Sequence, residues 1–337
     1  MSEENSISTR IEKVASNIGI VENSNKLVGD ASTRTYFRIS FRDRETAIAM
    51  VAPKPGSNEE TPFIEVQKYL ENLGLPVPKI YFHDPEAGIV VLEDLGDDLL
   101  ENVVSSMSVE EMRSIYTLAL DTLLDLQRTT SLSQSRCLSF DLAFDEAKLI
   151  QEMDFFMTHF VKGWARKNPE ASAIAEMARF FKKICSKLAS EPRVFAHRDY
   201  HSRNLILKNN RLYMIDFQDA RMGPVQYDPA SLLRDSYVSL PEDLVENLLY
   251  MYFEKADFLV ERDFDYFRRI FDLMSLQRNI KALGTFGYQI AAKGSTRYIS
   301  SISRTAANVL INLRKYPEFS PHYPALEEYI LAPALSA

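Results

Sequence analysis

The stretch FAHRDYHSRNLILKNNRLYMIDFQD, residues 195–219, carries polar side chains at a spacing that suits phosphoryl transfer. The tripeptide HRD ends at Asp199, Asn204 follows after four residues, and Asp216 lies twelve residues beyond Asn204. This matches the pattern H-R-D-x-x-x-x-N, in which the aspartate accepts the proton of an attacking hydroxyl. The asparagine and a later aspartate supply oxygen ligands of the kind that Mg²⁺ prefers. The spacing therefore predicts phosphoryl transfer assisted by magnesium.

Two other interpretations of this stretch are weaker. A polar surface hairpin needs no fixed residue types, and four fixed identities at fixed spacing arise by chance in about one chain in a thousand of this length. A zinc site on His197 and His201 needs a helix to bring the two ligands together, whereas this segment is expected to be a loop. We expect His197 to support the loop.

The elements that must position these side chains follow from the apolar pattern. Two short β-prone runs, 204–207 and 212–216, flank the sequence KNNR at 208–211, which is typical of a hairpin turn. The apolar side chains of both runs are suited to burial, and burial would hold the polar residues of the hairpin in place.

The first 95 residues mix strand-like and helical patterns. An amphipathic helix is expected near 6–18, and TAIAMVA at 46–52 suits a strand that ends at PKPG. PFIEVQKYLENLG has helical spacing and stops at Gly74, a suitable C-cap. Two further strands are expected at 78–96.

The remaining residues read mostly as helices. Ser108 and Glu111 have capping-box spacing ahead of a long helical pattern, and Ser239 and Glu242 repeat that spacing ahead of another. Further helical patterns lie near residues 142–166 and 169–190.

A small mixed region before a large helical one predicts an α+β chain with a two-lobed, protein-kinase-like fold. We expect a nucleotide-binding lobe at 1–95 and a catalytic and substrate-binding lobe at 96–337. A cleft between the lobes would be the natural place for a ligand.

Composition narrows the function classes. A net charge of −8 and a pI near 5.3 argue against a general nucleic-acid binder. Cys137 and Cys185 lack metal-type spacing and fit a reducing compartment. The first residues lack a basic start followed by an apolar core, and the apolar runs fall far short of about 18 residues, so we expect neither a signal peptide nor a membrane span. We expect a soluble cytoplasmic protein with a small-molecule substrate and no nucleic acid, membrane or obligate protein partner.

Several segments across most of the chain resemble the aminoglycoside phosphotransferase-like kinases: GDASTRTYFRI, VLEDLGDDLL, HRDYHSRNLIL, YMIDFQDARMGPVQYDPASLLRD and QRNIKALGTFGYQ. Within this family, the sequence of the catalytic stretch is most similar to that of bacterial kinases that phosphorylate N-acetylmuramate and N-acetylglucosamine at C1. The resemblance implies Asp199 as base, Asn204 and Asp216 as magnesium ligands, and ATP as donor. It also implies recycling of cell-wall sugars toward UDP-linked precursors. Arg198 and Tyr200 replace residues of the usual H-G-D-type loop and argue against an antibiotic-resistance role.

The nucleotide-binding residues depart from the kinase pattern. Kinases carry a lysine on the third strand of the small lobe, and TAIAMVA contains none. Lys54 follows this strand, and Arg34 and Arg38 lie near a loop that lacks G-x-G-x-x-G; solvated surface charge is an equal alternative for both arginines. Glu65 is the usual partner of the missing lysine. The predicted nucleotide-binding set is Arg34, Arg38, Lys54, Glu65, Glu93 and Leu95, of which the last two, with Asp94, would bind adenine through their backbone.

The acceptor-binding residues are expected in the second lobe. The predicted set is His201, Arg203, Asp228, Arg234 and Arg278, and Lys281 lies close to the last of these in QRNIKALG. An arginine is suited to the lactyl carboxylate of a muramate, which it would bind with two hydrogen bonds. Arg234 and Asp235 fit equally well as an ion pair at a helix end, and Asp228 as a helix cap.

The leading hypothesis is an ATP- and Mg²⁺-dependent kinase for the anomeric hydroxyl of an amino sugar. One alternative is a kinase for another small hydroxyl compound, of the choline, homoserine or aminoglycoside type. A second alternative is a nucleotide-binding pseudokinase that regulates other proteins, which the missing strand lysine favours and the intact Asp199, Asn204 and Asp216 oppose.

Overall fold

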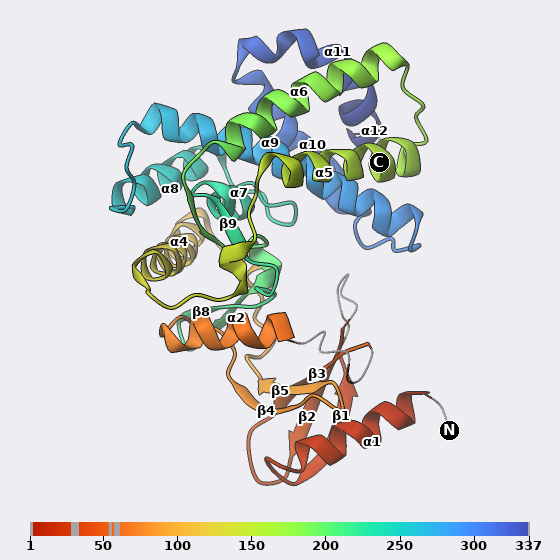
Figure 1. Cartoon of the computed structure of the whole chain (residues 1–337), viewed down its shortest axis with the longest axis vertical. Coiled ribbons are helices and arrows are strands. Elements are labelled where there is room, and N and C mark those ends of the chain that lie inside the picture. The colour runs from red at the N-terminus through yellow and green to blue at the C-terminus, as the bar shows by residue number, and fades with distance from the viewer. Residues whose placement is uncertain (1–2, 28–33, 54–55, 57–60, 336–337) are drawn as a thin grey trace. The chain divides into compact units, whose positions relative to one another are not determined.

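The computed structural model describes residues 3–27, 34–53, 56 and 61–335, and every structural statement below concerns these residues. The chain divides into two compact units, one made of residues 1–98, 135–138 and 206–219 and one of residues 99–134, 139–205 and 220–337. The first is a small mixed unit and the second a large helical one, as predicted (Figure 1). The first unit includes hairpin residues that the sequence-based boundary at residue 95 assigns to the second lobe.

The first unit is built on an antiparallel sheet with the strand order β1-β2-β3-β5-β4. Its elements are α1 (Glu3–Ala15), β1 (Val21–Lys26), β2 (Thr35–Phe41), β3 (Ala47–Val51), α2 (Thr61–Asn72), β4 (Ile80–Asp84) and β5 (Ile89–Glu93). The predicted cap of α2 is present, since Gly74 adopts a left-handed φ of 76° that glycine tolerates without strain.

The two faces of this sheet differ because successive side chains of a strand alternate. Phe37 and Ile39 of β2 and Ala49 of β3 are buried in a core shared with Ile11 of α1. Arg38 and Met50 belong to the opposite face. Met50 is fully buried within β3, the strand on which kinases carry their phosphate-binding lysine.

The predicted hairpin is confirmed as β7 (Leu205–Lys208) and β8 (Arg211–Met214). Asn209 and Asn210 between them have φ angles of 51° and 57°, the left-handed values that a two-residue hairpin turn requires. The backbone N–H of Met214 donates to the carbonyl oxygen of Pro76 at 2.8 Å, which ties the hairpin to the first unit.

The second unit is mostly helical, and in its described residues no helix has the length and apolar character needed to cross a bilayer. Its elements are α3 (Leu100–Val104), α4 (Val109–Leu132), η1 (Leu138–Asp141), α5 (Glu146–Phe156), the π-helical η2 (Met157–Trp164), α6 (Ala171–Ala189), β6 (Arg193–Ala196), η3 (Ser202–Asn204), β9 (Arg221–Pro224), α7 (Tyr227–Leu233), α8 (Glu242–Lys255), α9 (Phe264–Ala291), α10 (Ile299–Arg314), η4 (Pro317–His322), α11 (Tyr323–Leu326), η5 (Glu327–Leu331) and α12 (Ala332–Leu335).

Helix α9 runs through the second unit and packs against α5, α6, α7, α8 and α10 (Figure 1). Two glycines permit its close approach to α5 and η2. A Cβ at Gly284 would meet the Cα of Phe156 at 2.8 Å, and one at Gly287 would meet the carbonyl oxygen of His159 at 2.5 Å. Larger residues at either position would push these helices apart.

The two capping-box predictions had opposite outcomes. Ser108 and Glu111 form the reciprocal pair at the start of α4. The prediction for Ser239 and Glu242 is wrong, because α8 begins after Pro241 and no side chain caps it. The carboxylate of Glu242 instead accepts two hydrogen bonds from Arg234, a stronger charge-assisted partner than a backbone N–H.

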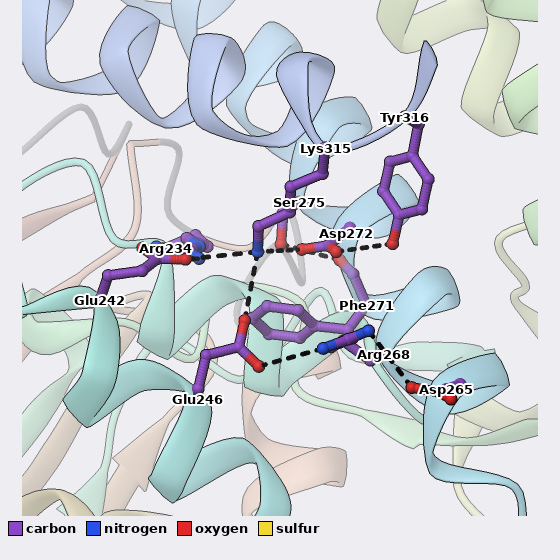
Figure 2. Close-up of polar contacts among 10 residues, drawn as sticks. All are labelled: Arg234, Glu242, Glu246, Asp265, Arg268, Phe271, Asp272, Ser275, Lys315 and Tyr316. Carbon is purple, nitrogen blue, oxygen red and sulfur yellow. Dashed lines mark hydrogen bonds and ion pairs between the residues drawn. The ribbon is translucent and has the colours of Figure 1, made fainter. Parts of the chain in front are cut away.

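A cluster of charged side chains fastens the end of α10 to α8 and α9 (Figure 2). The ammonium of Lys315 lies 3.3 Å from carboxylate oxygens of Glu242 and Glu246 and 3.2 Å from Asp272. Asp272 is fully buried and also accepts a hydrogen bond of 2.8 Å from the Tyr316 hydroxyl. Burial raises the pKa of Asp272, and the charge of Lys315 acts against that rise.

Replacing Lys315 with methionine should lower the free energy of unfolding by about 3 kcal/mol, because it leaves the buried Asp272 carboxylate without its cation. Urea unfolding at neutral pH measures this. The matched control is Lys255→Met, which removes an ion pair with Asp121 whose side chains are 44% and 41% exposed. An exposed pair contributes about 0.5 kcal/mol, so equal losses in the two variants would contradict a stabilising role for Lys315.

Candidate active site

The catalytic loop follows β6 and is held on both sides of Asp199, by a residue of α7 and by one just after this helix. Before Asp199, the two carboxylate oxygens of Asp228 accept the backbone N–H groups of His197 at 2.7 Å and Arg198 at 3.0 Å. After it, Asp235 accepts the N–H of Ser202 at 3.0 Å. Arg198 has a φ of 81°, a strained value for a non-glycine residue that tends to occur at functional sites.

Three cations surround the carboxylate of Asp199. Its Oδ1 lies 3.5 Å from Lys281 Nζ and 3.7 Å from Arg278 Nη2, and its Oδ2 lies 3.9 Å from Arg198 Nε. Burial alone would raise the pKa of Asp199, but these cations hold it far below its usual range. Asp199 is therefore ionised at neutral pH, and with 26% of its side chain exposed it remains accessible to a ligand.

Asn204 ends η3, five residues after Asp199, and supports the loop from within. Its side-chain Nδ2 donates to the backbone oxygen of Asp199 at 2.9 Å. This bond fixes the orientation of the amide and leaves its oxygen as the atom suited to a metal ion.

Asp216 belongs to the first unit, where it follows β8. Its φ of 64° is another left-handed value, and Gln218 donates to its Oδ1 at 2.7 Å. The next residue, Phe217, is fully buried and stacks on Phe63 of α2 with ring centroids 5.0 Å apart. The buried ring anchors the chain and leaves the Asp216 side chain exposed.

The oxygens of Asn204 and Asp216 are chemically suited to Mg²⁺. Within the described residues, no group of three or more histidine, cysteine, aspartate or glutamate side chains is placed to hold a metal ion. Magnesium needs few protein ligands, because waters and substrate phosphates complete its shell. A pair of ligands made of one amide oxygen and one carboxylate oxygen therefore fits magnesium better than zinc.

Of the predicted nucleotide-binding residues, Arg38 and Glu93 are held in ion pairs. The guanidinium of Arg38 contacts Asp94 at 2.6 Å and Asp97 at 2.8 Å. Glu93 accepts a hydrogen bond of 3.0 Å from Lys208, which also donates to the backbone oxygen of Asp94 at 2.8 Å. These contacts organise the segment after β5 and occupy the charge of Arg38.

A cavity of about 760 Å³ in the first unit is lined by this segment. Leu95 and its neighbours from Asp94 to Asp98 form one side, and Leu207 to Asn210 of the hairpin form another. Leu95 thus lines a cavity, although the residue itself is buried. Sequence reasoning missed Asp97 and Lys208, which are far in sequence from the residues they contact.

The other nucleotide-binding candidates are less informative. Glu65 on α2 accepts a hydrogen bond of 2.7 Å from the backbone N–H of Leu138. Arg34 is partly buried just before β2. Lys54 lies outside the described residues.

Among the predicted acceptor-binding residues, Arg278 contacts Asp199, and His201 is one of the charges that lower the pKa of Asp199. Arg203 pairs with Glu101 through two bonds of 2.6 and 3.0 Å. Arg234 is almost fully buried and pairs with Glu242. Its partner is thus not the expected Asp235, whose carboxylate accepts the N–H groups of Ser202 and Tyr237. Asp228 is not the cap of its own helix, since α7 begins at Tyr227.

Known proteins match this chain over most of its length. A sequence profile of the phosphotransferase enzyme family matches residues 25–266. The N-acetylmuramate/N-acetylglucosamine kinase of Pseudomonas aeruginosa is 32% identical over 294 residues, which cover 86% of this chain and 84% of that protein. The protein of the same name from Neisseria meningitidis is 30% identical over 305 residues and covers 89% of both.

Solved structures agree on the fold. The chain resembles an ADP-bound aminoglycoside phosphotransferase with a TM-score of 0.62, 17% identity and coverage of 89% of this chain and 96% of that one. The fold is thus the predicted two-lobed, protein-kinase-like one. The profile match and the two curated relatives include the catalytic loop in the part of the chain that they match. This chain therefore belongs to the phosphotransferase enzyme family and transfers a phosphoryl group to a hydroxyl of its acceptor.

Proposed function

We propose that this chain is an ATP- and Mg²⁺-dependent kinase that phosphorylates the anomeric hydroxyl of an amino sugar, N-acetylmuramate or N-acetylglucosamine. The product would be a sugar 1-phosphate, the form from which UDP-linked cell-wall precursors are rebuilt. Its need for ATP would place the reaction in the cytoplasm.

The observation that carries this proposal is the name shared by relatives that are 30–32% identical over 86–89% of the chain. The site supports it chemically. An ionised, accessible carboxylate at Asp199 can orient a hydroxyl, and nearby cations suit the charge of a transferred phosphoryl group.

The protein groups would act mainly by positioning. Asp199 would accept a hydrogen bond from the anomeric hydroxyl and then its proton, while the new bond forms from that oxygen to the γ-phosphorus and the bond to the leaving ADP oxygen breaks. Its low pKa makes it a weak base, which suits a loose transition state that needs little proton transfer before bond formation. Asp228 and Asp235 would keep the loop in this geometry.

Asn204 and Asp216 would hold the magnesium ion through their side-chain oxygens. A magnesium ion held there would supply positive charge that offsets the charge of the nucleotide phosphates. Arg278 would bind the acceptor, where a lactyl carboxylate would match its guanidinium. The backbone near Leu95 would receive the adenine.

A panel of sugars incubated with ATP and read by phosphorus NMR tests this proposal. We expect an anomeric phosphate with N-acetylmuramate, N-acetylglucosamine or both. EDTA should abolish turnover, and excess MgCl₂ should restore it, because neither Asn204 nor Asp216 carries a positive charge that could neutralise the phosphates.

Two outcomes would point elsewhere. A stable phosphomonoester on a non-anomeric hydroxyl, or turnover only with choline, homoserine or an aminoglycoside, would contradict the acceptor. ATP binding without any turnover, equal in the wild type and in Asp199→Ala, would support a regulatory pseudokinase.

A further inference from the structure

Three cations are gathered around the carboxylate of Asp199. Arg198, Arg278 and Lys281 all lie within 4 Å of it. The nearby carboxylate of Glu152, in the same unit, is buried and accepts a hydrogen bond of 2.9 Å from Gln277. Glu152 acts on Lys281 and Asp228 acts on Arg278, and these carboxylates offset part of the positive charge. The cations still contact the group that orients the acceptor, so a phosphoryl group transferred to that acceptor comes within their reach.

The two arginines also have structural roles in the loop. Arg278 donates from Nη2 to the backbone oxygen of Arg198 at 3.2 Å, and its guanidinium lies 5.1 Å from the ring centroid of Tyr227. Arg198 itself carries the left-handed backbone that shapes the turn before Asp199. The side chain of Arg278 and the backbone of Arg198 therefore help to hold the loop, and both guanidinium groups help to neutralise Asp199.

Lys281 differs from them. It lies one helical turn after Arg278 on the same face of α9. Its ammonium has three donors, and within the described residues Asp199 is the acceptor that they reach, at 3.5 Å. Its side chain is 14% exposed, so the ammonium is largely removed from water and yet has donors to spare for a ligand.

The position of Lys281 suits the transferred phosphoryl group. A hydroxyl that donates to Asp199 lies about 2.7 Å from the carboxylate, and the phosphorus it attacks is about 3–3.5 Å further on. An ammonium 3.5 Å from the same carboxylate oxygen can reach both this oxygen and an oxygen on that phosphorus. The Asp199 charge keeps the pKa of Lys281 raised despite burial, so the cation is present at neutral pH.

We propose that Lys281 is a catalytic residue that donates to the phosphoryl group during transfer and supplies there a cation that β3 does not carry. This inference rests on the proposed phosphoryl transfer to a hydroxyl. It assigns Lys281 to the donor phosphate and not to the acceptor. The transferred group carries its negative charge whatever the sugar, whereas only N-acetylmuramate carries a carboxylate.

The test compares Lys281→Met and Lys281→Arg with Lys255→Met, which removes an exposed cation of the same unit whose ammonium pairs with Asp121 at 2.6 Å. Steady-state kinetics are measured with both sugars. We expect Lys281→Met to lower kcat by about 10²–10³-fold with both sugars and to change the KM for each little, as the loss of one transition-state donor does. Lys281→Arg should recover part of kcat, and Lys255→Met should stay near the wild type.

A second measurement needs no sugar. Aluminium fluoride with ADP mimics a phosphoryl group in transfer, and isothermal titration gives the affinity for ADP with and without it. We expect aluminium fluoride to raise the affinity of the wild type for ADP. Lys281→Met should bind ADP alone with unchanged affinity but should not bind it more tightly when aluminium fluoride is added. Unchanged affinity for ADP alone also shows that the variant is folded. If Lys281→Met does not fold, Lys281→Gln takes its place in both measurements.

Three results would overturn the assignment: a loss of kcat confined to N-acetylmuramate, an equal loss in Lys255→Met, or a gain in ADP affinity from aluminium fluoride that survives in Lys281→Met. A wild type that is inert toward both sugars would contradict the proposed acceptor but not the role of Lys281. The aluminium fluoride measurement would then test that role by itself. If aluminium fluoride also failed to raise the affinity of such an inert wild type for ADP, both the proposed acceptor and the role of Lys281 would be overturned.

Discussion

Replacing Asp199 with asparagine is expected to lower kcat by about 10³-fold, the usual contribution of a positioned general base. The asparagine keeps the size of the side chain but offers an amide where the hydroxyl must donate. It also removes the charge that Lys281, Arg278 and Arg198 share. Steady-state assays with ATP and the sugar that serves as acceptor measure the loss.

The control for this variant is Asp141→Asn, at an exposed aspartate of the second unit, which should retain wild-type kcat. ADP binding by both variants establishes that they are folded. A variant Asp199→Asn with more than a tenth of wild-type kcat would remove Asp199 from the reaction and would favour another group as the one that orients the hydroxyl.

The catalytic stretch could be predicted because its information is local. Asp199, Asn204 and Asp216 lie within 18 residues of one another, and the hairpin that separates them carries its own turn signal in Asn209 and Asn210. A fixed spacing on a short hairpin is set by backbone geometry, with little influence from the rest of the chain. The same locality made the capping box at Ser108 predictable.

Contacts between distant segments could not be predicted in the same way. Arg38 pairs with Ile48 across β2 and β3, and Ile48 pairs with Leu92 on β5, so the sheet register brings Arg38 near Asp94, 56 residues away. Without the strand order, Arg38 reads as a free cation for phosphate.

Competition between partners explains the failed cap at Ser239. The motif there is sound, but a buried arginine from the preceding helix holds Glu242. A local pattern does not reveal such a competitor. Asp228 was misread for a related reason: it faces a loop about 30 residues earlier, and its own helix begins before it.

That loop contact leads to the second large effect. Replacing Asp228 with asparagine should lower the free energy of unfolding by about 2–4 kcal/mol, since a charge-assisted hydrogen bond is lost and a buried donor is left unsatisfied. The reason is geometric. Both oxygens of this fully buried carboxylate accept backbone N–H groups, from His197 and Arg198. An asparagine must turn its NH₂ group toward one of them.

The same change should lower kcat by about 100-fold, because a small displacement of the loop moves Asp199 out of line with its acceptor. Asp263→Asn is the matched control. There a single oxygen, Oδ1, accepts the N–H groups of Asp265 and Tyr266 at the start of α9, and asparagine caps a helix about as well as aspartate does. Urea unfolding and kinetics at pH 8 compare the two variants.

The pH dependence separates this account from a general loss of packing. Burial raises the pKa of Asp228 to about 7, against the influence of the two N–H donors and of Arg278. A proton on either oxygen creates the same conflict as the asparagine NH₂ group. The wild-type kcat should therefore fall as the pH decreases through about 7, whereas Asp228→Asn, which has no proton to gain there, should lack this step. A step of equal size in both would mean that another group titrates, and that Asp228 holds the loop without controlling its activity.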